Sequence, residues 1–147
     1  MDPYVTYVRP RWSDMDVFGH VNHASLVTLL EDARVPLLFE DSADAGLSDF
    51  AKGTVVVRLE VRYMAPIVAA GQEIRMRISL SELKNASFTL DYDVHSGPSD
   101  EDTVAARAQV VLAPYDVARQ RPRRLTEPER SFLAGRLGAG AEVRSDG

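Results

Sequence analysis

The sequence predicts an α+β fold in which a curled antiparallel sheet of about five strands wraps around one long helix. One stretch, from Leu26 to Leu37, has the apolar spacing of a long helix with a buried stripe. Other stretches alternate apolar and polar residues or are rich in β-branched residues, as strands are. These stretches are residues 3–12, 54–64, 74–80, 88–94 and 103–115. Their apolar faces need a cover, and the amphipathic helix is the only candidate.

The N-terminal part is expected to form a first strand and then the helix. Residues 3–12 carry β-branched and aromatic side chains, and Pro10, which cannot donate to a strand ladder, suggests a sheet edge or a strand end. The helix is predicted over residues 23–39, with Asn22 as its cap because that side chain can accept a helix N–H. Pro36 removes a backbone donor, so we expect a kink or an early end there.

The remaining strands are expected to be consecutive and antiparallel after a polar loop over residues 41–53. The strand at 54–64 alternates most regularly, with one face predicted to carry Val55, Val57, Leu59, Val61 and Tyr63. Tight turns at 84–86 and 96–102 separate the last three strands. The prediction is therefore a four-strand meander that follows the helix.

A short helix and a tail are predicted beyond the sheet. The segment Thr126–Glu129 is typical of a helix start, so we expect a helix near residues 126–135. The end of the chain, 136–147, is small and polar and is expected to be disordered. The chain is interpreted as one domain, residues 1–135, with that tail attached.

Composition excludes several classes of function. The 147 residues contain no cysteine, which excludes a disulfide framework, a thiolate nucleophile and a cysteine-held metal. The net charge of −5 argues against general nucleic-acid binding, and no apolar run has transmembrane length. The first residues lack a signal-peptide pattern, so a cytoplasmic protein without membrane attachment is the simplest interpretation.

The densest cluster of polar and charged residues comes directly before the predicted helix. Asp14 and Asp16 come first, Gly19 allows the backbone to turn, and Asn22 ends the cluster. A helix N-terminus offers unpaired N–H groups and the positive end of the helix dipole to an anion. A carboxylate beside it can attack an acyl carbon or activate a water, while the N–H groups stabilise the oxyanion. The cluster therefore suits acyl transfer.

Three segments resemble a known family: Asp14-Met15-Asp16, Gly19-His20-Val21-Asn22 and Glu31-Asp32-Ala33-Arg34. They are similar to the pattern D-x-D-x-x-G-H-V-N-N, followed by a helix with E-x-A-R, of the hotdog-fold acyl-CoA thioesterases of the 4-hydroxybenzoyl-CoA thioesterase-like group. The resemblance extends more weakly over residues 4–115, including the segment Tyr63-Met64-Ala65-Pro66.

This resemblance implies a hotdog fold, assembly as dimers or tetramers, and hydrolysis of an acyl thioester without a cofactor or metal. It implies that Asp16 is the catalytic carboxylate and that N–H groups near His23 polarise the thioester carbonyl. Asn22 would orient the turn or a water. The residues expected to bind substrate are Gly19, His20, Leu26, Tyr63, Arg62 and Lys84.

The sequence also departs from the family pattern. His23 replaces the usual second Asn, and Leu26 stands where an aromatic is common, so the acyl specificity is not predicted. Of the basic run that grips CoA phosphates in some members, only Lys84 is present. Arg62 belongs to a second candidate grip, because Arg58, Arg62, Arg75 and Arg77 are expected on the non-core faces of adjacent strands.

Other interpretations of these residues stay open. Asp16 is also suited to capping the turn, and His20 to holding it by a hydrogen bond. A metal held by His20 and His23 lacks a clear third ligand. Glu31 and Arg34 have the spacing of a helical ion pair, here expected to be partly buried and structural.

The leading hypothesis is an enzyme that hydrolyses thioesters of CoA, or of acyl carrier protein, as a homodimer or a dimer of dimers. Asp16 is expected to act as nucleophile or general base, and the two mechanisms remain alternatives. Two rival hypotheses are a hotdog hydratase or dehydratase and an acyl-CoA-binding module without turnover.

Overall fold

The computed structural model describes residues 3–68, 71–137 and 144–146. Its strands are β1 (Tyr4–Val8), β2 (Thr54–Tyr63), β3 (Ile74–Lys84), β4 (Phe88–His95), β5 (Val104–Asp116), β6 (Arg121–Pro122) and β7 (Arg144–Asp146). Its helical segments are the 3-10 turn η1 (Trp12–Asp14), α1 (His23–Val35), the π-helical η2 (Pro36–Asp41), α2 (Ser42–Asp44), α3 (Asp49–Lys52) and α4 (Glu127–Arg136). None of these helices is long and apolar enough to cross a membrane.

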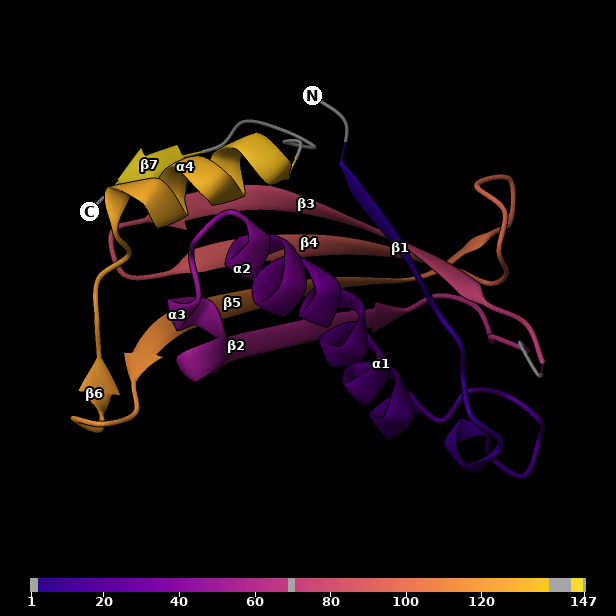
Figure 1. Ribbon diagram of the computed structural model, residues 1–147. Coiled ribbons are helices and arrows are strands. Elements are labelled where there is room, and N and C mark those ends of the chain that lie inside the picture. The colour runs from indigo at the N-terminus through magenta and orange to yellow at the C-terminus, as the bar shows by residue number, and fades with distance from the viewer. Residues whose placement is uncertain (1–2, 69–70, 138–143, 147) are drawn as a thin grey trace.

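The five long strands form one sheet in the order β1-β3-β4-β5-β2, and α1 lies across one face of it (Figure 1). The short strands β6 and β7 pair with β5 and β3. This confirms the predicted curled sheet around one long helix. The predicted four-strand meander is wrong in one connection, because β2 pairs with β5 and not with β3. Only β3, β4 and β5 form a meander, and β2 ends the five-strand path with β5 as its one neighbour in the described residues.

The core lies between α1 and the concave face of the sheet. The predicted apolar stripe of α1 is buried throughout, and it continues into η2 at Leu37. The helix-facing side chains of β4 are also fully buried and lie opposite buried partners on β5. The β4 residues are Phe88, Leu90, Tyr92 and Val94, and their β5 partners are Leu112, Val110, Ala108 and Ala106. The apolar stripe of α1 is buried against one face of the sheet. This explains why the sequence shows both the helical and the strand periodicity.

A β-bulge changes which residues of β2 face the helix. The register against β5 shifts between Val56 and Arg58, so β2 contains one extra residue there. Val56 and Leu59 therefore share the helix-facing side, although an odd number of steps separates them. The predicted apolar face is wrong for Val55, which lies on the opposite side from Leu59.

The α-helix ends directly before Pro36, which confirms the predicted early end, although the helical path continues beyond it. The α-helix ends at Val35, but the chain continues through Pro36 as the wider π-helical segment to Asp41, and then into α2. Wider hydrogen-bond spacing accommodates a residue that has no N–H and whose ring crowds the preceding turn. The predicted polar loop over 41–53 consequently contains α2 and α3.

The helix predicted near 126–135 is present as α4. The Thr126 hydroxyl accepts a hydrogen bond from the Glu129 N–H, and the Glu129 carboxylate accepts one from the Thr126 N–H. This reciprocal cap satisfies two donors at the helix start. Near its other end, Arg136 pairs with Asp41 at 2.6 Å and lies over the ring of Tyr4 at 5.4 Å.

The segment predicted to be disordered, 136–147, differs from that prediction where it is described. Arg136 ends α4, and residues 144–146 form β7, which pairs in parallel with the last residues of β3. Residues 138–143 and 147 lie outside the described part of the chain.

Candidate active site

The loop over residues 15–21 is closed by main-chain hydrogen bonds directly before α1. Met15 and Val21 form a β-bridge, the Asp16 N–H donates to the His20 carbonyl over 2.7 Å, and the Gly19 N–H donates to the Asp16 carbonyl over 3.1 Å. Gly19 has a φ of +76°, and a Cβ there would meet nothing within 4 Å. Backbone conformation, and not crowding, therefore requires glycine at this turn.

The carboxylate of Asp16 has one oxygen engaged and one free. Its Oδ1 accepts hydrogen bonds from the N–H groups of Phe18 at 2.9 Å and His20 at 3.1 Å. Its Oδ2 has no hydrogen-bond partner among the described residues. The turn-holding interpretation of Asp16 thus accounts for one oxygen, and the second remains available for chemistry.

Asp14 has a different environment and supports the turn. It is 3% exposed, its Oδ2 accepts a 2.7 Å hydrogen bond from the Arg11 N–H, and its Oδ1 lies 3.3 Å from the Arg11 guanidinium. Burial raises the pKa of Asp14, but the Arg11 hydrogen bonds and charge outweigh burial and hold the pKa below its ordinary value. The Asp14 carbonyl also accepts from the Asn22 N–H, which ties η1 to the start of α1.

The start of α1 leaves a single N–H unused. Asn22 is the helix cap, as predicted: its Oδ1 accepts from the N–H groups of Ala24 at 2.8 Å and Ser25 at 3.3 Å. The Leu26 N–H bonds the Asn22 carbonyl. Among the described residues, the N–H of His23 is therefore the one first-turn donor without a partner. Several main-chain N–H groups near His23 were expected to be available to a substrate carbonyl, and the described structure leaves one.

A cleft of about 410 Å³ lies beside Asp16, and we name it the inner cleft. Five predicted site residues line it: Asp16, His20, His23, Leu26 and Tyr63. The Tyr63 hydroxyl donates to the His23 carbonyl over 2.6 Å, and the two rings meet edge to face with centroids 6.4 Å apart. Burial raises the pKa of Tyr63, which keeps the hydroxyl protonated as a donor at neutral pH.

The rest of the inner cleft was not predicted. Its wall includes residues 64–67, Ala105 and Ala106. Main-chain hydrogen bonds hold this wall: the Val21 N–H donates to the Ile67 carbonyl, and the Met64 N–H donates to the Ala105 carbonyl. The segment that follows Tyr63 could have indicated this wall, but its family resemblance alone does not predict that it lines the cleft.

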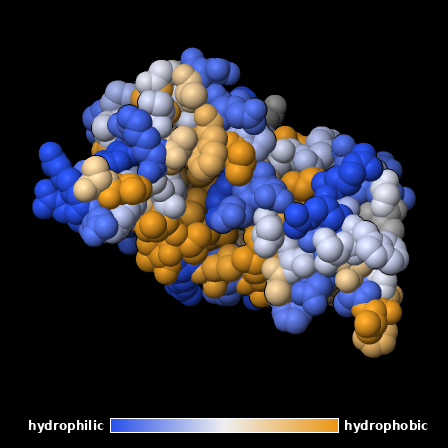
Figure 2. Space-filling view, turned by 60° about the horizontal axis from the view of Figure 1, so that its bottom comes forward, coloured by the Kyte–Doolittle hydropathy of each residue, from blue (hydrophilic) through white to orange (hydrophobic). Residues whose placement is uncertain are grey.

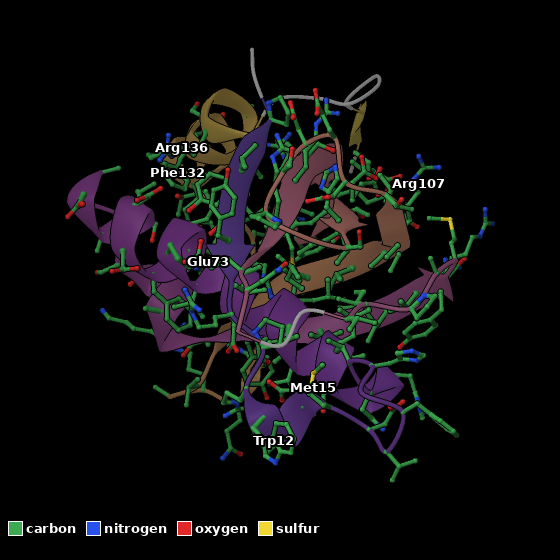
Figure 3. All side chains as sticks on the ribbon, turned by 90° about the vertical axis from the view of Figure 1, so that its right-hand side faces the viewer. Trp12, Met15, Glu73, Arg107, Phe132 and Arg136 are labelled. Atoms are coloured by element: carbon green, nitrogen blue, oxygen red, sulfur yellow. The ribbon has the colours of Figure 1, made fainter. Side chains whose placement is uncertain are left out.

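A second cleft, of about 690 Å³, shares Asp16 with the first, and we name it the outer cleft. Gly19 and Asn22 line it, together with three residues that sequence reasoning missed: Trp12, Met15 and Val17. Trp12 and Met15 lie close to one another at the lower end of the molecule in Figure 3. The sequence could have indicated this cleft, because it places three large apolar side chains next to the two aspartates of the predicted turn.

Arg62 and Lys84 are not brought to either cleft. Arg62 lies opposite Arg107 on the outer face of the sheet, and Figure 3 shows Arg107 well away from Met15. Lys84 ends β3 at the opposite end of the sheet from the inner cleft and pairs with Glu82 at 3.1 Å.

The arginines expected on adjacent strands are also apart, because β4 and β5 lie between β2 and β3. No group of three His, Asp or Glu side chains within the described ranges is placed to hold a metal ion.

The chain belongs to the thioesterase-like superfamily, because a model of that family matches residues 10–134. This confirms the predicted hotdog-type thioesterase family, and the family supports thioester hydrolysis as the general reaction. A search among curated proteins finds no match.

Solved structures of thioesterases share the fold. A thioesterase from Thermus thermophilus, in complex with coenzyme A and Zn, has 28% identity and a TM-score of 0.72, covering 91% of this chain and 99% of its own. A predicted thioesterase from Bacillus stearothermophilus has 21% identity and a TM-score of 0.76, with coverage of 94% and 98%. A 1,4-dihydroxy-2-naphthoyl-CoA thioesterase from Synechocystis has 15% identity and a TM-score of 0.69, with coverage of 88% and 94%.

Proposed function

We propose that this protein hydrolyses acyl-CoA thioesters to a free acid and CoA, with Asp16 as the reacting carboxylate. The observation that carries the proposal is that two residues lining the inner cleft, Asp16 and His23, each keep one polar group unused. These are the Oδ2 of Asp16, which has no partner among the described residues, and the N–H of His23 at the start of α1. A thioester carbonyl between them would meet a nucleophile or base on one side and a donor on the other.

The proposed chemistry follows from these two groups. Oδ2 of Asp16 either attacks the carbonyl carbon or takes a proton from an attacking water. Attack by the carboxylate gives a mixed anhydride and a CoA thiolate, and water later hydrolyses the anhydride and restores the carboxylate. In both routes the C–S bond breaks and the departing thiolate takes up a proton to become the CoA thiol, from solvent in the first route and from protonated Asp16 in the second. The His23 N–H and the helix dipole stabilise the oxyanion, an effect worth about 3–4 kcal/mol per donor. The Oδ1 hydrogen bonds keep the carboxylate oriented before substrate arrives.

Coenzyme A as the thiol is supported by the Thermus neighbour, whose structure contains it. A carrier-protein thioester presents the same pantetheine arm and is a variant of the same proposal. Neither Arg62 nor Lys84 lines the inner or the outer cleft of its own chain, so a phosphate grip beside these two clefts within one chain would need other residues.

The substitution Asp16→Asn tests the role of the carboxylate. Asn retains an oxygen that accepts from Phe18 and His20, so the turn is expected to survive. Thiol release from a panel of acyl-CoAs should fall at least about 100-fold. The matched control is Asp44→Asn, an exposed carboxylate on α2, which should leave the rate unchanged. Wild-type rates in the Asp16 variant on every substrate would reject the proposal.

Two rival functions are separated by the same set of ligands. Hydration of crotonyl-CoA without thiol release would identify a hydratase. Tight acyl-CoA binding with neither reaction would identify a binding module.

A second copy of the chain is the partner we propose for the free edge of β2. This ten-residue strand exposes Val57 at 62%, Leu59 at 38% and Tyr63 at 50%, and a broad apolar area covers this part of the molecule in Figure 2. A long apolar edge strand offers unpaired N–H and C=O groups and apolar area to another strand. Pairing of two β2 strands would satisfy both and would bring a second chain beside the inner cleft at Tyr63.

A further inference from the structure

Three large apolar side chains project from the turn that carries Asp16. Trp12 is 89% exposed, Val17 94% and Phe18 78%. Figure 2 shows an apolar tip at the lower right of the molecule, where this turn projects. Single exposed apolar residues are ordinary, but three within one short turn beside a cleft form a local apolar surface.

The inner and outer clefts meet at Asp16, so a thioester centred on this residue has two directions in which to place its two arms. The inner cleft carries polar groups suited to an amide-bearing pantetheine arm, among them the imidazoles of His20 and His23 and the Tyr63 hydroxyl. In the outer cleft, Asp16 is the one ionisable residue of the lining, and the wall is made by Trp12, Met15 and Val17.

We propose that the outer cleft holds the apolar acyl group of the thioester and that Trp12 determines specificity for bulky acyl groups. This inference rests on the proposed function. It assigns the acyl group to the cleft that is not lined by Leu26 and Tyr63, two of the residues expected to bind substrate. A volume of about 690 Å³ lies within the range of small-molecule sites.

Hydrogen bonds hold the main chain that carries the apolar wall without a ligand. The Met15 N–H donates to the Trp12 carbonyl over 3.2 Å, and the buried Asp14 binds the N–H and the guanidinium of Arg11 on the other side of Trp12. Because this backbone is already ordered, binding of the acyl group costs conformational entropy only in the side chains. Each methylene buried there should raise kcat/KM by about fourfold, the equivalent of about 0.8 kcal/mol.

Trp12 is the only tryptophan in the chain, so intrinsic fluorescence reports on the proposed wall directly. The wild-type protein would be titrated with S-octyl-CoA, a thioether that cannot be hydrolysed, and with S-ethyl-CoA and CoA. S-octyl-CoA should shift the emission to shorter wavelength, and the other two ligands should not. An equal shift with CoA alone would assign the wall to the nucleotide arm and overturn the proposal.

Two further fluorescence results would overturn it. An emission that shifts with protein concentration in the absence of ligand would assign the wall to a contact between copies of the chain. An unmoved emission with S-octyl-CoA, in a protein that hydrolyses octanoyl-CoA, would place the acyl group elsewhere.

Kinetics supply the second test. Trp12→Ala should lower kcat/KM for octanoyl-CoA at least about tenfold and leave acetyl-CoA within about twofold. Because Trp12 is 89% exposed, its loss leaves the core intact. Val17→Ser should lower the octanoyl-CoA value in the same sense. The matched control is Val117→Ser, an exposed valine after β5, which should change neither value.

Equal losses for both acyl groups, or no loss for either, would overturn the specificity role of Trp12. Failure of the proposed function has a different signature, because a protein without hydrolase activity would release no thiol from any substrate. The S-octyl-CoA titration would still decide whether the outer cleft binds the acyl group.

Discussion

The hydroxyl of Tyr63 donates a hydrogen bond to the main-chain carbonyl of His23 over 2.6 Å and so joins the end of β2 to the first turn of α1. The unused N–H of the helix start belongs to the same residue, His23. The bond therefore holds the donor side of the inner cleft against the sheet, while the carboxylate side is held by the turn at Asp16.

Tyr63→Phe should loosen this connection. We expect a loss of about 1 kcal/mol in the free energy of unfolding, the usual net value of one hydrogen bond, and a lower kcat because the His23 N–H is less well placed. Denaturant unfolding and thiol release measure the two effects. The matched control is Tyr7→Phe: Tyr7 is similarly exposed, at 49%, and its hydroxyl bonds nothing in the described chain. Equal effects from the two substitutions would contradict this role for the bond.

Gly19→Ala should strain the turn and not crowd it. The φ of +76° costs a residue with a Cβ about 1–2 kcal/mol, although the space around Gly19 is open. We expect lower stability and a reduced rate, because the strained turn carries Asp16. Gly135→Ala is the control: it also has open space but lies inside α4, where alanine should stabilise by up to about 1 kcal/mol. Two losses of similar size would argue against backbone strain at Gly19.

Leu59→Lys should separate the proposed dimer. Leu59 lies on the helix-facing side of β2 but is 38% exposed, so a lysine there introduces charge beside the edge where a second strand would pair. Size-exclusion chromatography with light scattering should give a dimer or larger for the wild type and for Val117→Lys, and a monomer for Leu59→Lys. A wild-type monomer at micromolar concentration would remove the proposal that a second copy completes the edge.

The buried carboxylate of Glu129 should contribute stability that depends on pH. Burial raises the pKa of Glu129, but the 2.8 Å bonds from Arg123 and the bonds from Thr126 outweigh burial and lower the pKa below the ordinary value of 4.5. A carboxylate whose pKa is lower in the folded state stabilises the fold fully at a pH above its ordinary, unfolded-state pKa. This stabilisation is lost as the pH falls through the folded-state pKa.

Glu129→Gln should therefore lower the free energy of unfolding at pH 7 by about 3 kcal/mol, because it leaves Arg123 without its buried partner. The difference from the wild type should shrink below pH 4.5. Denaturant unfolding between acid and neutral pH measures both. Glu127→Gln, at a side chain 89% exposed, should cost under about 0.5 kcal/mol. A difference that stays constant with pH would contradict the link to the Glu129 carboxylate.

Much of the fold was predictable because apolar spacing reports burial element by element. The stripe on α1 and the faces of β3, β4 and β5 followed from periodicity. Periodicity does not name a strand's partner, so the pairing of β2 with β5 was missed. Periodicity also does not reveal a single inserted residue. Because of the bulge at Val57, Val55 lies on the opposite face of the sheet from the one predicted.

The part of the site that was predictable is local in sequence. Asp16 Oδ1 bonds residues two and four positions away, and Asn22 caps the helix that follows it. Arg62 and Lys84 lie outside both clefts of their own chain, and their positions depend on long-range register, which local spacing does not report. The Glu31–Arg34 pair lies between these cases: Arg34 is buried and also donates to the Tyr92 hydroxyl, but Glu31 lies 3.9 Å away with a side chain 67% exposed.

The contact of Arg136 with Tyr4 and Asp41 joins the last described helix to the first strand. Figure 1 shows the start of β1 close to the end of α4 in the upper part of the molecule, while the turn that precedes α1 lies at the lower right. A solid support or a label attached through either end of the described chain would therefore be held on the side away from both clefts. Immobilised protein should keep Asp16 facing the bulk solution, which makes surface-bound assays with soluble thioesters practicable.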